Sequence, residues 1–77
     1  MAFRNIMITG SMKLYIKDQQ LVIDNGNEVS FPLEDINCIL IENQAVTLSA
    51  YFLQKVADWG IALYVCDEKH LPNAVLL

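Results

Sequence analysis

The run Cys66-Asp67-Glu68-Lys69-His70 carries the side chains best suited to acid–base or metal chemistry. Asp67, Glu68 and His70 would supply carboxylate oxygens and an imidazole, which divalent metals accept as ligands. The run follows an apolar, strand-like segment, and ligands often gather at the carboxyl ends of strands. A metal site would need ligands converging from elsewhere, and the sequence has one histidine and no second cluster of this kind. We interpret the run as a solvated turn and predict no metal ligand.

Other kinds of reactive site are not indicated. The serines Ser11 and Ser49 lack a nearby histidine and acid of the kind that activates a nucleophile. The three glycines are too far apart to form a phosphate-binding loop. Cys38 and Cys66 lie in apolar runs, where a thiol usually acts as a small hydrophobe, so we do not expect a disulfide or a zinc site. The sequence therefore predicts no catalytic residue.

The composition limits the classes of partner. Nine acidic residues against five basic ones give a net charge of −4 and a pI of about 4.6, which disfavours strong binding of nucleic acid or of a membrane surface by this chain alone. No apolar run reaches the ~18 residues of a membrane span and no signal peptide is recognised, so we expect a cytoplasmic protein. The hydrophobic fraction of 55% indicates a dense β-rich core, or apolar surface that meets a partner or a further domain, and both can hold.

Short strands separated by turns fill the first half of the chain. Gly10-Ser11, Asp18-Gln19 and Asp24–Asn27 carry turn-forming residues. The strands predicted between them are Phe3–Thr9, Lys13–Lys17, Leu21–Ile23 and Glu28–Phe31, and Pro32 is expected to stop the ladder because it has no N–H to donate.

A strand–helix–strand unit is predicted next. Ile36–Ile41 is apolar enough for a strand covered on both faces. Thr47–Trp59 has helical periodicity, with Thr47 or Ser49 as N-cap and Gly60 as the left-handed residue that ends the helix. Its predicted buried face consists of Leu48, Tyr51, Phe52, Val56 and Trp59.

A strand follows this helix directly, and a strand–crossover–strand order suggests a parallel pair. We therefore predict one α+β domain over residues 1–77, with about six or seven short strands and one helix. The final apolar run, residues 74–77, should form a strand or lead into more protein, so we expect the chain to be the first part of a larger protein.

Several segments, in order and over nearly the whole chain, resemble one family. They are R-N-I-M-I-T-G-S, K-L-Y-I-K-D-Q-Q-L-V-I, L-E-D-I-N-C-I-L-I-E, the T-L-S before the helix and V-C-D-E-K-H-L-P-N-A-V-L. Together they resemble the N-terminal β-domain of the CRISPR-associated integrase Cas1, in its type II branch. The resemblance implies a metal-dependent DNA endonuclease and integrase that, with the Cas2 protein, inserts captured DNA into a CRISPR array.

The same resemblance implies that the Mg²⁺ or Mn²⁺ site lies in a C-terminal helical domain outside these 77 residues, so the chain alone should be inactive. The β-domain is expected to form a homodimer and to bracket the ends of duplex DNA.

In relatives a ring residue after the first strand wedges against the terminal base pair, and the matching position here is Ser11, which cannot stack. Either Met12 inserts as an apolar wedge or no wedge exists. Arg4 and Lys13 are the predicted phosphate neighbours.

A function of a different class remains open. The chain could be a stand-alone β-rich interaction module or regulatory subunit with no enzymatic role. For the integrase domain, the high apolar fraction and the expected edge strands predict a dimer. A proline at Val29, in a candidate edge strand, should then weaken it.

Overall fold

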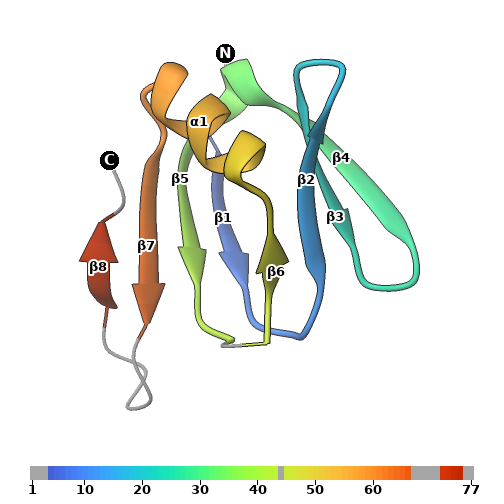
Figure 1. The fold of residues 1–77 in the computed structure, drawn as a ribbon, viewed down its shortest axis with the longest axis vertical. Helices are drawn as coiled ribbons and strands as arrows, with labels where there is room; N and C mark the ends of the chain where they lie inside the picture. The colour runs from blue at the N-terminus through green and yellow to red at the C-terminus, as the bar shows by residue number, and fades with distance from the viewer. Residues whose placement is uncertain (1–3, 44, 67–71, 76–77) are drawn as a thin grey trace.

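The computed structural model describes residues 4–43, 45–66 and 72–75, the last four by their backbone alone. It contains two four-stranded sheets and one α-helix (Figure 1), which confirms the predicted α+β class. The terminal strand β8 (Pro72–Val75) completes the predicted seven strands, and the two-residue strand β6 (Thr47–Leu48) is an eighth that was not predicted. In the described part of the chain, no helix has the length and apolar character to cross a membrane.

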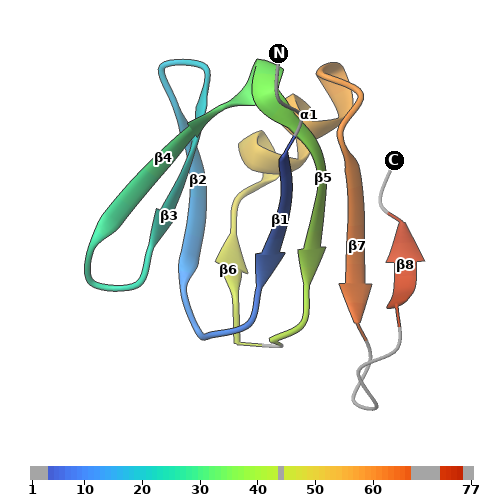
Figure 2. The ribbon, with the colours of Figure 1, turned by 180° about the vertical axis from the view of Figure 1, so that it is seen from behind.

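The first sheet has the strand order β1-β5-β7-β8. Strands β1 (Arg4–Ile8), β5 (Ile36–Ile41) and β7 (Ala62–Cys66) run parallel, and β8 is antiparallel to β7. The helix α1 (Ala50–Asp58) joins β5 to β7. It lies in front of the first sheet in Figure 1 and behind it in Figure 2, so it covers one face of that sheet. The predicted parallel strand–helix–strand unit is confirmed.

The second sheet has the order β4-β3-β2-β6. Strands β2 (Lys13–Lys17), β3 (Gln20–Asp24) and β4 (Glu28–Pro32) form two consecutive hairpins, and β6 pairs with β2 in parallel. The first hairpin turns at Asp18 and Gln19, whose φ angles are 53° and 61°. This left-handed geometry suits the right-handed twist of a two-residue hairpin.

The ladder between β3 and β4 ends at Pro32, as predicted, but Pro32 is itself the last residue of β4 and pairs with Gln20. The backbone N–H of Leu33 donates to the carbonyl of Gln19 at 3.1 Å. Hydrogen-bonded and non-hydrogen-bonded pairs alternate along an antiparallel ladder. The Pro32–Gln20 pair is therefore of the second kind, and the missing N–H of Pro32 would have faced away from β3. A proline is tolerated there because β4 is an edge strand.

Helix α1 begins three residues later than predicted, because Thr47 and Leu48 are used by β6. Ser49 is the N-cap, and its side-chain oxygen accepts from the Phe52 N–H at 3.1 Å. The helix ends before Gly60, whose φ of 67° is the left-handed conformation expected there.

The core lies between the two sheets and α1. It draws buried side chains from both sheets, the helix and the short 3₁₀ helix Leu33–Asp35: Ile8, Leu14, Leu21, Leu33, Ile36, Ile39, Ile41, Phe52, Val56, Ile61 and Leu63. The predicted burial of Tyr51 and Trp59 is wrong, since they are 52% and 44% exposed. On a nine-residue helix that packs on one side only, Phe52 and Val56 occupy the inner face, and these two aromatics lie outside it.

Strand β5 is covered on one face by the described residues, and not on both as predicted. Ile39 and Ile41 are buried, whereas Cys38 and Leu40, on the opposite face, are partly exposed. Met7 pairs with Leu40 on this outer face and is 60% exposed. The outer face of the first sheet therefore presents apolar side chains.

Candidate functional site

Three of the four predicted DNA-proximal residues lie together: Ser11 and Met12 in the turn between β1 and β2, and Lys13 as the first residue of β2. The hydroxyl of Ser11 donates to the carbonyl of Ala45 at 3.2 Å. The N–H of Thr47 donates to the carbonyl of Met12 at 3.0 Å. These bonds join the turn to the segment that follows β5. The polar role of Ser11 in this structure is thus to hold two neighbouring connections together.

Asn43 makes a further bond between the same two connections and one bond within its own connection. Asn43 donates through Nδ2 to the carbonyl of Thr9 at 3.5 Å, and its Oδ1 accepts from the Ala45 N–H at 2.7 Å. Both connections lie where the parallel strands β1 and β5 end (Figure 1). The candidate site is therefore a fixed turn at the carboxyl end of the first sheet.

Met12 is partly buried and packs against the core. The end of the Met12 side chain folds back over the turn and lies against Gly10. A Cβ atom added to Gly10 would stand 3.3 Å from the Cε of Met12. Ser11 is the exposed residue at this point. An apolar wedge at Met12 would require this side chain to leave its packed position, and it stays a prediction.

Arg4 lies apart from the turn. It begins β1, whereas the turn follows the end of that strand, and four steps along a strand cover about 13 Å. Its guanidinium carbon stands 5.4 Å from the ring centroid of Phe31. Lys13 lies beside the turn, with Nζ at 5.4 Å from the ring centroid of Tyr15. The structure thus groups Ser11, Met12 and Lys13 and separates Arg4 from them.

The acidic and histidine side chains after β7 (Asp67, Glu68 and His70) lie outside the described residues. Among the residues that are described, no three His, Cys, Asp or Glu side chains gather in a way that could hold a metal ion. The thiol of Cys38 donates to Oδ1 of Asn5 at 3.3 Å, and Cys66 is buried in β7. Both cysteines therefore lie in strands, as predicted.

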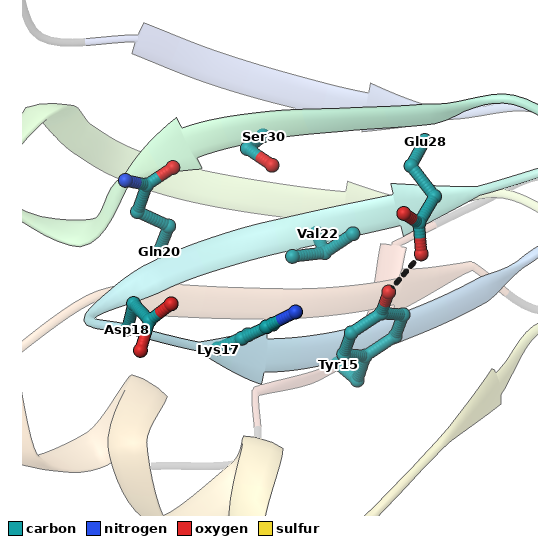
Figure 3. A pocket seen from close by; sticks show the side chains of 7 residues that line it. All are labelled: Tyr15, Lys17, Asp18, Gln20, Val22, Glu28 and Ser30. Carbon is teal, nitrogen blue, oxygen red and sulfur yellow. Dashed lines mark hydrogen bonds between the residues drawn. The ribbon is translucent and has the colours of Figure 1, made fainter.

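A shallow groove on the outer face of the second sheet was not predicted (Figure 3). Tyr15, Val22 and Ser30 form one row across β2, β3 and β4. The hydroxyl of Tyr15 donates to Oε2 of Glu28, and this bond is the main cause that raises the pKa of Tyr15 to about 12. The sequence did contain a signal for this groove: Lys13, Tyr15 and Lys17 alternate along β2, which places all three side chains on one face of the sheet.

No family model matches the chain. The CRISPR-associated endonuclease Cas1 of Neisseria meningitidis is 40% identical to it over 73 residues, which cover 94% of the chain and 24% of the relative. The chain belongs to the Cas1 family. It spans about a quarter of the length of this relative and matches an N-terminal Cas1 domain.

Solved structures show the same fold. A Cas1 protein from Thermotoga maritima matches with a TM-score of 0.80 and 15% identity, over 94% of this chain and 23% of that one. A Cas1 solved in complex with DNA matches with a TM-score of 0.77 and 8% identity, over 96% and 28%. A casposase bound to its integration product matches with a TM-score of 0.70 and 15% identity, over 100% and 24%. The chain thus has the fold of a Cas1 domain.

Proposed function

We propose that the chain is the dimerisation and DNA-end-bracketing domain of a CRISPR spacer-acquisition integrase. The observation that carries this proposal is the 40% identity to a CRISPR-associated endonuclease over nearly the whole chain. The full-length protein would be a DNA endonuclease and integrase that uses Mg²⁺ or Mn²⁺ and works with Cas2 in the cytoplasm. The described residues contribute structure and contacts to this activity, and no chemical step is assigned to them.

Two features of the described surface support self-association. Strand β4 is an edge of the second sheet, and its Val29 is 50% exposed. The outer face of the first sheet exposes Met7 and part of Leu40. Unpaired strand edges and exposed apolar side chains are the usual elements of a two-fold interface. A second copy of the chain would shield whichever of these two surfaces forms the interface.

DNA contact would be local, because the acidic chain as a whole repels phosphate. Among the described residues, Lys13 is the cation that directly follows the β1–β2 turn in the chain, and it is exposed. The turn itself is held by the bonds of Ser11 and Met12 to the neighbouring connection. A rigid turn with one flanking cation can contact the backbone at the end of a duplex. It would add little affinity by itself and would help to position the end.

The first experiment is the mass of the purified chain by light scattering, with and without a short duplex with splayed ends. We expect a mass near two chains, a further increase with DNA, and no nuclease activity in Mn²⁺. A monomer that ignores DNA would contradict both assigned roles. In the DNA-bound state, Lys13→Ala should lower the slope of log affinity against log salt by about one. Lys55→Ala, on α1 and away from the turn, is the matched control and should leave this slope unchanged.

A further inference from the structure

A second groove, of about 320 Å³, lies at the opposite end of the molecule from the β1–β2 turn. Three parts of the chain line it: the β2–β3 hairpin turn, the end of β4 with the following 3₁₀ helix, and the C-terminus of α1. The lining residues are Asp18, Gln19, Gln20, Pro32, Glu34 and Trp59. None of the proposed functions above uses these residues.

The walls of this groove are fixed by the backbone. The Leu33 N–H donates to the carbonyl of Gln19 at 3.1 Å, which ties the hairpin turn to the residue after Pro32. The N–H of Trp59 donates to the carbonyl of Lys55 at 3.0 Å at the end of α1. The groove therefore exists before any partner binds, which reduces the entropy that binding would cost.

The hairpin turn has an unusual sequence for its geometry. Asp18 and Gln19 both have positive φ, which asparagine and glycine adopt most readily in a two-residue hairpin. A glutamine in this conformation is uncommon. Strained backbone of this kind often occurs at binding sites. Because the turn consists of Asp18 and Gln19, two polar side chains line the groove. An Asn-Gly turn of the same geometry would provide only one, since glycine has no side chain.

The groove combines an aromatic surface with negative charge. Trp59 is 44% exposed and presents an indole ring, and Asp18 and Glu34 are exposed carboxylates. The C-terminus of α1 adds the partial negative charge of its last carbonyl groups. No lysine or arginine is among the six lining residues. The nearest cation on the helix is Lys55, which lies one turn before Trp59. Its Nζ stands 5.5 Å from the ring centroid of Tyr51, one turn further towards the start of the helix and so on the side away from Trp59.

We infer that this groove binds an arginine side chain of a partner polypeptide. A guanidinium is planar, stacks on an indole face and donates several N–H bonds to carboxylate and amide oxygens, and the lining residues offer all of these. A nucleobase could also stack on Trp59, but the phosphates beside it would meet two carboxylates and no cation. The single arginine of this chain, Arg4, already stands over Phe31. The arginine is therefore expected from outside these 77 residues, and we assign it to a partner polypeptide.

Trp59 is the only tryptophan of the chain, so its fluorescence and its indole N–H resonance report on this groove alone. We would titrate the chain with a blocked Gly-Arg-Gly peptide and with the peptide carrying citrulline, which has the same shape without the charge. The arginine peptide should shift the indole resonance in a saturable way, and the citrulline peptide should bind about tenfold more weakly. Equal binding of the two peptides, or no shift with arginine, would overturn the inference.

Charge-neutral variants locate the site. Asp18→Asn and Glu34→Gln should each weaken binding of the arginine peptide by about threefold, as expected for exposed carboxylates. Asparagine is well tolerated at positive φ, so the first variant keeps the turn. Glu42→Gln removes the same charge at the other end of the molecule and should bind like the parent chain. If all three variants weaken binding equally, or if oligothymidylate shifts Trp59 and the peptide does not, the arginine site is wrong.

Discussion

At the scale of single residues, the outer face of the second sheet places a hydrogen-bonded polar pair beside a buried apolar side chain. Val22 points outward in the central strand of the hairpins, yet it is only 5% exposed. Tyr15 and Glu28 lie on the strands to either side and are joined by a hydrogen bond (Figure 3). This bond crosses β3 beside Val22, and all three residues line the same groove.

The bond between Tyr15 and Glu28 predicts a pH dependence. Tyr15 donates its proton, and its pKa is raised from 10.0 to about 12, chiefly by this bond. A raised pKa in the folded state means that the bond contributes fully below pH 10 and is lost as the pH rises towards 12. In an alkaline titration followed by ultraviolet absorbance, we expect one of the three tyrosines to ionise last, near pH 12.

Glu28→Gln should move that last ionisation down towards pH 10, because the amide is neutral and a weaker acceptor than the carboxylate. Tyr15→Phe should remove it, while circular dichroism confirms that the sheet is intact over the same range. A high-pH ionisation that persists in Tyr15→Phe would assign it to another tyrosine and disprove the link to Glu28.

At the scale of elements, the sequence predicts type and order well and predicts burial less well. The strand Lys13–Lys17, the strand Ile36–Ile41 and the position of Gly60 agree with the structure, because turn residues and periodicity are local signals. The exposure of Tyr51 and Trp59 could not be read locally. It depends on which side of α1 the sheets contact, and that is set by long-range packing.

The same reasoning explains what was found and missed at the candidate site. The proximity of Ser11, Met12 and Lys13 follows from their adjacency in the chain. The hydrogen bond of Ser11 to Ala45 joins residues 34 positions apart, and the groove at Trp59 joins three separate segments. Neither leaves a local pattern in the sequence. The positive φ at Gln19 likewise has no local signal, because glutamine does not favour it.

The one-sided packing of α1 predicts a contrast between neighbouring aromatics. Phe52 is fully buried, whereas Tyr51 contacts Lys55 on the surface. Phe52→Ala should lower the free energy of unfolding by about 3–5 kcal/mol, and Tyr51→Ala by less than about 1 kcal/mol. Urea unfolding measures both. If Phe52→Ala does not fold, Phe52→Leu, with an expected loss of about 1 kcal/mol, keeps the comparison measurable. Equal losses of unfolding free energy at the two positions would contradict the assignment of Phe52 to the buried face of α1 and of Tyr51 to the exposed face.

At the scale of the whole molecule, the chain has a small core and two surfaces that invite association. One is the free edge of β4, and the other is the apolar outer face of the first sheet around Met7.

The hydrogen-bond ladder between β3 and β4 decides which proline substitution can test the edge of β4. Since Leu33 bonds Gln19, the alternation places the N–H of Val29 towards β3 and that of Ser30 away from it. Val29→Pro would therefore damage the sheet itself, and Ser30→Pro is the cleaner probe.

If β4 is the dimer seam, Ser30→Pro should raise the dimer dissociation constant by about tenfold, because a partner strand would lose a backbone donor. Ser30→Ala keeps that donor and should behave like the parent chain. Val29→Pro should lower both dimer affinity and unfolding free energy, since it breaks a bond within the ladder. Sedimentation velocity measures association, and urea unfolding separates it from stability. If Met7→Asp gives monomers while Ser30→Pro remains dimeric, the seam is the outer face of the first sheet and not the edge of β4. Burying a carboxylate at an apolar interface costs several kcal/mol, so Met7→Asp would break a seam on that face. A strand edge that takes no part in the interface tolerates proline, so Ser30→Pro would then leave the dimer intact.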